Sequence, residues 1–345
     1  MKTQVAFKSP PRQDDVVQHS LLPTLCSTLI DSDYQLRSLR WAERFGLLPT
    51  QVALLKAAQI QVDELARMTY RTSDPEVRQI STDVLLWFFL ADDQFDERVC
   101  GYLPEQMHAV SERFVRVLQT GDASLAICPL SQALLDLRGR FLARTDNAWL
   151  ERFTTNLQLY LRGCVQEAIN RAAGTTPSRV EYRDIRRASV GTYPCFDVIE
   201  LTMQQTLPAE LDRDADLAEL RDVATDVIAW INDIVSFKKE SAFADPHNVI
   251  SVLMAEESLD VRNATLAAHA LIRLRTADWQ RLEKAAQVRF QDRVAHEYIA
   301  GIRSWIEGVQ DWSYRSRRYG SDYLQLSKDA HYDLLAQAHS TRSAG

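Results

Sequence analysis

Four carboxylates stand within six residues of one another, directly after an apolar run. They are Asp92, Asp93, Asp96 and Glu97, and the run that precedes them is Trp87 to Ala91. Asp92 and Asp96 are four residues apart, so on a helix they share one face. Close carboxylates repel one another unless a cation binds between them. Carboxylate oxygens suit Mg²⁺, and water molecules and substrate phosphates usually complete the coordination shell of that ion. The four carboxylates therefore predict a magnesium site. The alternative is a helix end whose acidic side chains are exposed to solvent.

A second polar series lies much further along the chain. Asn232, Ser236 and Glu240 follow one another at intervals of four residues, in a segment otherwise rich in Ile, Val, Trp and Phe. One amide oxygen, one hydroxyl and one carboxylate on one helix face make a second oxygen site for Mg²⁺, and Lys239 adds a cation beside it. The alternative is the exposed polar stripe of an amphipathic helix.

In combination, the two series resemble those of the class I terpene synthases, in particular the single-domain microbial type. That family pairs a DDxxD helix with an NxxxSxxxE helix. Other residues match the family in order, over roughly residues 80–320: Tyr182, Arg186, Ser189 and Gly191 before the second series, and His247-Asn248 and Arg318-Tyr319 after it. One departure is that serine occupies position 189, where the family more often has an acidic residue or threonine.

The resemblance implies three Mg²⁺ ions, with Mn²⁺ as a substitute. Asp92 and Asp96 would bind two ions, and Asn232, Ser236 and Glu240 would bind the third. Asp93 is expected either as a further metal ligand or, with Glu97 and Asp233, as a partner of the basic groups.

The resemblance also assigns the substrate contacts. Arg186 would sense the diphosphate, with Ser189 as the linker and Val190 as the effector at a helix break, acting through its backbone carbonyl. The diphosphate would further contact Lys239, Arg318 and Tyr319, because cations and hydrogen-bond donors stabilise the departing charge. Aromatic faces stabilise carbocations, so the expected cavity wall contains Phe88, Phe89, Trp305 and Trp312, together with Val190 and Cys195. For the aromatic residues, the alternative is ordinary core packing.

The implied activity is that of a lyase acting on a linear isoprenyl diphosphate. Farnesyl diphosphate is the first expectation and geranylgeranyl diphosphate the second, with cyclisation to a terpene hydrocarbon or alcohol and release of diphosphate. One rival is a chain-elongating isoprenyl diphosphate synthase, which typically carries a second aspartate-rich motif where this chain has Asn232 to Ser236. A catalytically inactive helical interaction protein is the other.

The elements that must position these residues are helices. The chain has 345 residues, of which 11 are Gly and 11 are Pro, and it has no series of alternating apolar and polar residues that would indicate β-strands. This favours one all-α domain over 1–345, with the helices bundled around a central cavity. An extended arm is expected at 1–18 and a C-terminal segment with a frayed end at 321–345. Helices are expected at 51–70, 75–96, 148–172, 178–189, 213–239, 247–257, 261–286 and 290–316, with a break near Gly191 and Pro194. Pro104 and Pro129 mark the starts of two others.

Composition limits the partners. The net charge is −7, which argues against nucleic acid, and no apolar run is long enough for a membrane span. Scattered thiols predict reduced cysteines and a cytoplasmic protein; they are Cys26, Cys100, Cys128, Cys164 and Cys195. A homodimer through helical faces is a further expectation.

Overall fold

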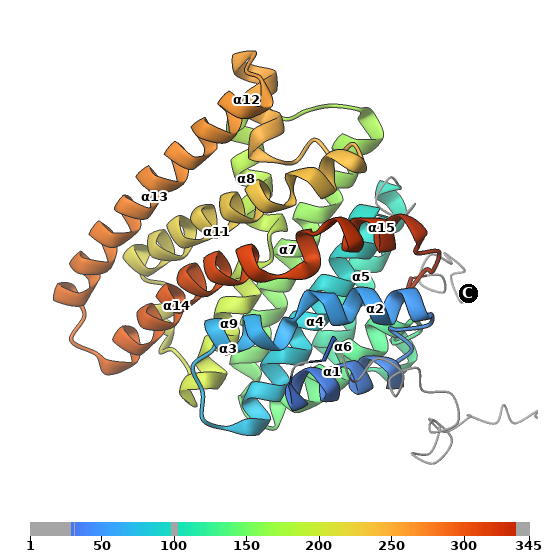
Figure 1. The fold of residues 1–345 in the computed structure, drawn as a ribbon. Coiled ribbons are helices and arrows are strands. Elements are labelled where there is room, and N and C mark those ends of the chain that lie inside the picture. The colour runs from blue at the N-terminus through green and yellow to red at the C-terminus, as the bar shows by residue number, and fades with distance from the viewer. Residues whose placement is uncertain (1–28, 31, 98–102, 336–345) are drawn as a thin grey trace, which may run out of the picture.

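The computed structural model describes residues 29–30, 32–97 and 103–335, and these residues form helices and connecting loops without a β-strand (Figure 1). The α-helices are α1 Asp33–Arg44, α2 Gln51–Ile60, α3 Val62–Thr69, α4 Pro75–Glu97, α5 Pro104–Thr120, α6 Pro129–Leu142, α7 Asn147–Ala173, α8 Arg179–Ser189, α9 Thr192–Met203, α10 Ala209–Asp212, α11 Ala215–Ala242, α12 Val249–Glu257, α13 Val261–Arg289, α14 Arg293–Arg315 and α15 Ser321–Asp329. Two 3₁₀ turns, η3 Ala123–Leu125 and η4 Arg317–Tyr319, complete the set. The all-α expectation is confirmed.

The helix that carries the first acidic series starts where its sequence signals predict. The Asp74 carboxylate accepts hydrogen bonds from the backbone N–H groups of Glu76 at 2.8 Å and Val77 at 3.2 Å. Pro75 occupies the first helical position, where its missing N–H costs nothing. The cap satisfies donors that the helix itself cannot use, so the beginning of α4 is fixed.

Several boundaries differ from the expectation. The segment 51–70 forms two helices because Gln61 adopts a left-handed conformation, φ 55° and ψ 48°, between α2 and α3. The break after α8 falls at Gly191, φ 74°, whereas Pro194 lies within the first turn of α9. Helices α1, α9, α10 and α15 occupy segments for which the sequence analysis predicted none.

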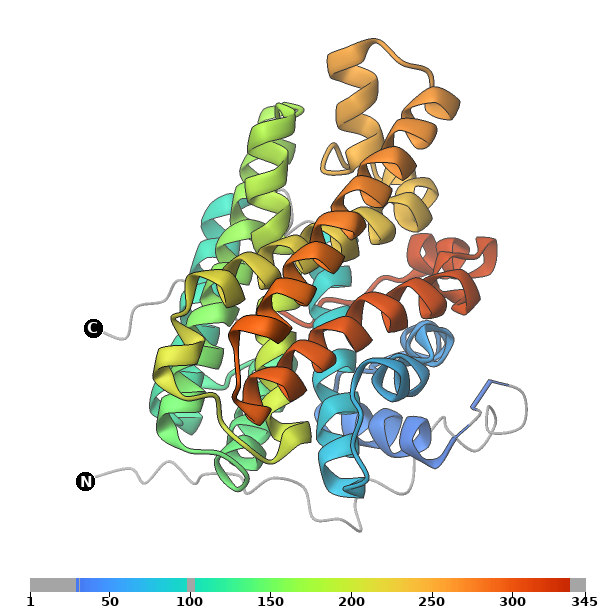
Figure 2. The same ribbon diagram turned by 90° about the vertical axis from the view of Figure 1, so that its left-hand side faces the viewer.

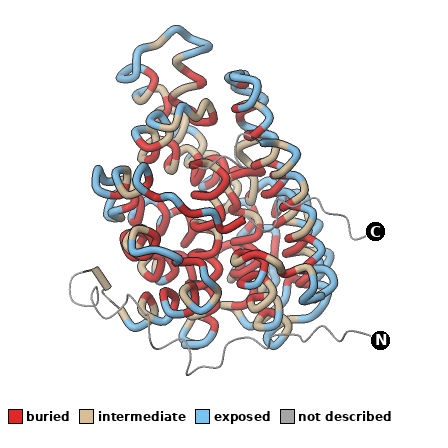
Figure 3. The backbone as a smooth tube through the Cα atoms, turned by 90° about the vertical axis from the view of Figure 1, so that its right-hand side faces the viewer, coloured by how far each residue is buried: buried red, intermediate tan, exposed pale blue. Residues whose placement is uncertain are grey.

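The helices form a bundle in which α11 lies between α13 and α14 and packs on both (Figure 1). Helix α12 and the adjoining end of α13 project from one end of the bundle (Figure 2). Figure 3 shows the buried residues gathered in the middle of the bundle, with the exposed residues towards the outside. The site residues therefore sit on helices that are packed on several sides.

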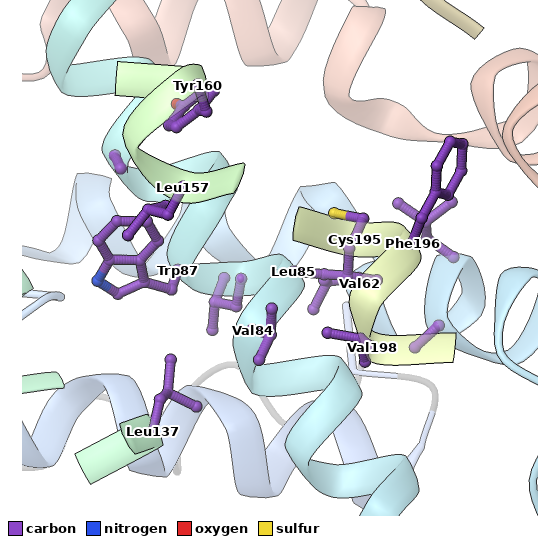
Figure 4. Packing of buried hydrophobic residues seen from close by; sticks show 14 of the residues in the cluster. Val62, Val84, Leu85, Trp87, Leu137, Leu157, Tyr160, Cys195, Phe196 and Val198 are labelled. Carbon is purple, nitrogen blue, oxygen red and sulfur yellow. The ribbon is translucent and has the colours of Figure 1, made fainter. Parts of the chain in front are cut away.

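Packing fixes the rotation of α4. Val84 and Trp87 of this helix are buried, with Leu157 of α7 on one side and Val62 of α3 on the other (Figure 4). The Trp87 indole N–H donates to the carbonyl of Leu130 at 2.9 Å. Large side chains held in this way leave the helix one orientation, and that orientation decides which carboxylates reach the cavity.

Some expectations cannot be compared with the structure. The arm at 1–18, the end of the C-terminal segment from 336, Cys26 and Cys100 lie outside the described residues, so a single domain over 1–345 stays a prediction. Cys128, Cys164 and Cys195 are free and buried, as expected. No helix in the described part of the chain combines the length and the apolar content that a membrane span requires.

Candidate active site

A cavity opens between α3, α4, α7, α8, α9, α11, α14 and η4, and the atom-free space in it and in the open solvent at its mouth totals about 850 Å³. Every residue that the sequence analysis assigned to a metal or substrate site lines it, except Asp93. These residues are Phe88, Phe89, Asp92, Asp96, Arg186, Ser189, Val190, Cys195, Asn232, Ser236, Lys239, Glu240, Trp305, Trp312, Arg318 and Tyr319. Segments far apart in the sequence thus meet at one site, although the individual roles stay predictions.

Asp92 and Asp96 present the first acidic series to the cavity. The Arg318 guanidinium donates to Asp92 Oδ2 at 3.1 Å, and the Arg171 guanidinium reaches Asp96 Oδ1 at 3.4 Å. Burial, and then the neighbouring Asp92 charge, raise the pKa of Asp96 well above its ordinary value. Two close carboxylates of this kind favour a cation between them.

Asp93 is not among the residues that line the cavity, and it is 1% exposed. Its carboxylate lies 3.1 Å from Lys56 Nζ and accepts hydrogen bonds from Arg318 at 2.9 Å and Tyr323 at 2.7 Å. Burial alone would raise the pKa of Asp93, but Arg318, Lys56 and Lys239 hold it well below its usual range. Of the two expected roles, pairing with basic groups is the one that these contacts fulfil.

The second series lines the same cavity as the first. Asn232 Oδ1 accepts from Arg186 at 2.8 Å, while its amide N–H donates to Tyr319 Oη at 2.8 Å. Glu240 accepts from the Asn248 amide at 2.8 Å, and burial, followed by the Asp233 charge, raises its pKa to about 7. The expected polar stripe therefore lies on the cavity wall and not on an exposed surface.

Arg186 is held by Asp233, one residue after Asn232. The Arg186 Nε–H donates to Asp233 Oδ1 at 2.9 Å. The other Asp233 oxygen accepts from the Tyr182 hydroxyl and from the backbone N–H of Val249 at 2.7 Å. A fully engaged, buried carboxylate fixes the guanidinium at the cavity wall.

The break between α8 and α9 rests directly on α7. A Cβ added to Gly163 would lie 2.5 Å from the backbone nitrogen of Ser189, closer than any side chain allows. One turn later, Glu167 Oε1 accepts a 2.5 Å hydrogen bond from the Ser189 hydroxyl. Gly163 and Glu167, one turn apart on α7, are thus the residues that contact Ser189 at the end of α8, next to the break.

Aromatic rings cover much of the remaining wall. Phe88 packs edge-on against Tyr160, with ring centroids 5.3 Å apart, and Phe89 lies 5.3 Å from Trp312. The Arg318 guanidinium stands 4.7 Å above the Phe89 ring. These faces can stabilise a positive charge in the cavity.

The donor set fits a hard divalent cation. The two series offer carboxylate, amide and hydroxyl oxygens, which are the ligands of Mg²⁺. Among the described residues, no three His, Cys, Asp or Glu side chains already converge as a closed metal site. That arrangement suits an ion that keeps water and phosphate ligands.

Sequence reasoning missed the residues that support this site from outside the motifs. They are Lys56 on α2, Tyr160, Glu167 and Arg171 on α7, and Tyr323 and Ser327 on α15. A lone lysine in the apolar segment 51–60 was a usable signal, because a lysine is almost never fully buried unless it is paired.

The chain is similar to known proteins over most of its length. A family model described as terpene synthase family 2, C-terminal metal binding, matches residues 83–278, a range that contains both polar series. The chain is 34% identical to the (+)-T-muurolol synthase ((2E,6E)-farnesyl diphosphate cyclizing) of Roseiflexus castenholzii, over 82% of this chain and 87% of that protein. It is also 34% identical to the germacrene A synthase of Nostoc punctiforme, over 84% of this chain and 91% of that one.

A solved structure supports the fold. The crystal structure of a-eudesmol synthase, 22% identical in sequence, superimposes with a TM-score of 0.72 and covers 82% of this chain and 94% of that chain. At this level of identity the likeness concerns the helical architecture.

Proposed function

The chain belongs to the terpene synthase family and is a class I terpene synthase, and on that premise we propose that it ionises and cyclises farnesyl diphosphate. Geranylgeranyl diphosphate is the second candidate substrate. The observation that carries the proposal is that Asp92 and Asp96 line the same cavity as Asn232, Ser236 and Glu240.

The matched family model describes a metal-binding region, which is consistent with a divalent metal cofactor. We propose that the enzyme binds three Mg²⁺ ions and that Mn²⁺ can substitute for them. Asp92 and Asp96 would hold ions on one side, and Asn232, Ser236 and Glu240 on the other. When bound, the ions neutralise the charge that develops on the departing diphosphate. The chain's own residues perform the remaining tasks.

Basic side chains between the two series would orient the diphosphate. Arg186, Lys239 and Arg318 all reach the cavity, and guanidinium groups donate two parallel hydrogen bonds to phosphate oxygens. Arg318 pairs with Asp92 and Asp93, and Arg186 pairs with Asn232 and Asp233. Part of this pairing must be exchanged for the diphosphate, which couples substrate binding to closure of the site.

The deeper wall would guide the cation after the diphosphate leaves. Phe88, Phe89, Trp305 and Trp312 offer aromatic faces, and Val190 and Cys195 lie at the helix break. The last carbonyls of a helix carry partial negative charge, so the end of α8 at Val190 is suited to stabilise a nearby positive charge. An apolar wall also excludes the water that would stop the reaction early.

The test is incubation with C10, C15 and C20 isoprenyl diphosphates and Mg²⁺, with and without isopentenyl diphosphate, followed by gas chromatography of the extract. Cyclic terpenes from the C15 substrate are expected. Longer diphosphates formed only with isopentenyl diphosphate would indicate chain elongation. Absence of turnover with all substrates, together with no rise in unfolding temperature on adding diphosphate and Mg²⁺, would indicate an inactive protein.

Two further proposals concern the whole protein. A homodimer would give twice the chain mass of 39.4 kDa in light scattering. A cytoplasmic location would be tested by cell fractionation.

A further inference from the structure

Tyr70 contacts two residues of the cavity wall without being one of the described residues that line the cavity. It follows the last residue of α3 and is 1% exposed. Its hydroxyl donates a 3.0 Å hydrogen bond to the backbone carbonyl of Cys195, in the first turn of α9. Its ring packs edge-on against Trp305 of α14, with centroids 5.3 Å apart and an interplanar angle of 78°. Because Cys195 and Trp305 both line the cavity, one buried side chain supports its wall at two helices.

The Tyr70 hydroxyl is also close to the side chains of these two residues. The Cys195 thiol and the Trp305 indole each lie near enough to interact with it. Burial raises the pKa of Tyr70 well above its ordinary value, so the hydroxyl keeps its proton. A neutral hydroxyl has one proton and two lone pairs. The proton is used on the Cys195 carbonyl, which leaves the lone pairs available to the thiol and to the indole N–H.

The helices around Trp305 are closely packed. A Cβ added to Gly301, one turn before Trp305 on α14, would lie 2.4 Å from a methyl carbon of Ile199 on α9. Contacts this close leave α9 and α14 little freedom to move past each other. Phe196 of α9 also packs edge-on against Trp305, with centroids 6.1 Å apart. With the helices held in this way, the orientation of the indole depends on the groups around its ring, of which Tyr70 is the one that adds a hydroxyl.

The orientation of Trp305 matters for the fate of a carbocation. The face of an aromatic ring carries negative charge and its edge positive charge, so the face attracts a cation and the edge does not. A small free-energy difference between two positions of the cation already changes a product ratio several-fold. A rotated indole would therefore alter the mixture of products. It would leave the release of diphosphate largely intact, because the polar residues at the cavity mouth assist that step.

We propose that Tyr70 is a positioning residue that sets product specificity by fixing the orientation of the Trp305 indole. The Cys195 carbonyl anchors the Tyr70 hydroxyl, and the hydroxyl and ring of Tyr70 together hold the indole. This inference rests on the proposed function. It concerns the choice among products of one substrate, so it can fail while the proposed function stands.

A single substitution tests the residue. Tyr70→Phe removes the hydroxyl and keeps the ring that packs on Trp305. Both proteins are incubated with farnesyl diphosphate and Mg²⁺, and the products are quantified by gas chromatography with mass spectrometry. The ratio of the main terpene to all other terpenes should fall by about five- to tenfold, the effect of losing one buried hydrogen bond, without a comparable loss in the rate of diphosphate release. An unchanged ratio, or an equal loss in diphosphate release, would overturn the assignment. Absence of diphosphate release from the parent would instead count against the proposed function.

A matched control lies on the same turn of α9. The Tyr193 hydroxyl also makes a hydrogen bond, to Asp222 at 2.7 Å, and Tyr193 is not one of the described residues that line the cavity. Tyr193→Phe should leave the product ratio unchanged, and a change as large as that in Tyr70→Phe would overturn the assignment.

A double-mutant cycle tests whether Tyr70 acts through Trp305. Trp305→Phe should change the product ratio by itself. Adding Tyr70→Phe to that variant should change the ratio much less than Tyr70→Phe does in the parent, because residues that act through one contact are not additive. Fully additive effects on the logarithm of the ratio would overturn the proposed route through the indole.

Discussion

The hydroxyl of Ser189 donates a 2.5 Å hydrogen bond to the buried carboxylate of Glu167, which lies on a different helix. The resemblance to the family implies that an acidic residue or threonine is more common at position 189, where this chain has serine. In this chain the carboxylate reaches the break between α8 and α9 from α7 instead. The break that we assign to substrate sensing is therefore coupled to α7.

Replacing Glu167 should impair turnover more than stability. Glu167→Ala leaves the Ser189 hydroxyl without its acceptor and frees the break to move. Loss of a charge-assisted hydrogen bond corresponds to about 10- to 100-fold in kcat. Diphosphate release under saturating substrate measures it. Glu151→Ala, an exposed position on the same helix, is the control; equal kcat in the two variants would remove Glu167 from the sensing path.

Gly163 and Gly139 offer a matched pair of glycine-to-alanine substitutions. At Gly163 the new methyl group would meet the backbone of Ser189, so Gly163→Ala should lower the free energy of unfolding by about 1–3 kcal/mol and also reduce turnover. At Gly139, in the interior of α6, nothing lies within 4 Å of the added Cβ, and alanine should stabilise by about 0.5–1 kcal/mol. Urea denaturation followed by circular dichroism measures both. A neutral Gly163→Ala would show that α7 and the break separate readily.

Lys56 forms ion pairs with two of the four carboxylates of the first acidic series. Its ammonium is fully buried, 3.1 Å from Asp93 and 2.7 Å from Glu97. Lys56→Met should cost about 3–5 kcal/mol in unfolding free energy, because it leaves buried charge unpaired. It should also raise KM, since the two carboxylates would then draw Lys239 and Arg318 away from the diphosphate.

The control for Lys56 is Lys328→Met, at an exposed position on α15. The double variant Lys56→Met/Glu97→Gln should recover part of the lost stability, because it removes one of the stranded charges. If Lys56→Met changed stability but left KM untouched, the lysine would serve the fold alone.

The sequence predicted what local pattern controls and missed what distant contacts decide. The start of α4 at Asp74-Pro75 and the polar stripe of α11 followed from caps and helical spacing. The left-handed turn at Gln61 did not, because glutamine has no intrinsic preference for that conformation. Lys56 and Tyr323 were missed because their partners lie 41 and 230 residues away, and no periodic pattern encodes such a pairing.

Asp197 should make stability depend on pH. Burial raises the pKa of this carboxyl well above its ordinary value of 3.8, although Asn156 donates to it at 2.8 Å. The folded protein therefore binds this proton more tightly than the unfolded chain does. The stability that this proton contributes is complete when the pH is below the pKa of Asp197 in the unfolded chain. It is lost as the pH rises through the pKa of Asp197 in the folded protein.

Asp197→Asn removes the titrating group and keeps an acceptor for Asn156. Relative to the parent, the unfolding temperature of the variant should gain as the pH is raised from 4 towards 9. Thermal unfolding in a series of buffers measures the difference. Parallel curves for the two proteins would mean that Asp197 ionises as easily in the fold as in water.

Substitutions of the three aspartates of the first series should have two different effects, one on metal binding and the other on stability. Chelation should abolish turnover and leave the helical circular dichroism signal in place, because the core is built from buried apolar side chains. Asp92→Asn and Asp96→Asn should weaken Mn²⁺ binding in the presence of inorganic diphosphate by about 10- to 100-fold, measured by electron paramagnetic resonance, with little change in stability. Asp93→Asn should instead lower the unfolding free energy by about 3–5 kcal/mol, since it strips the buried cations Lys56 and Arg318 of a shared partner. If Asp93→Asn lost Mn²⁺ as severely as Asp92→Asn while unfolding like the parent, Asp93 would be a direct ligand, and α4 would have to turn when the metal binds.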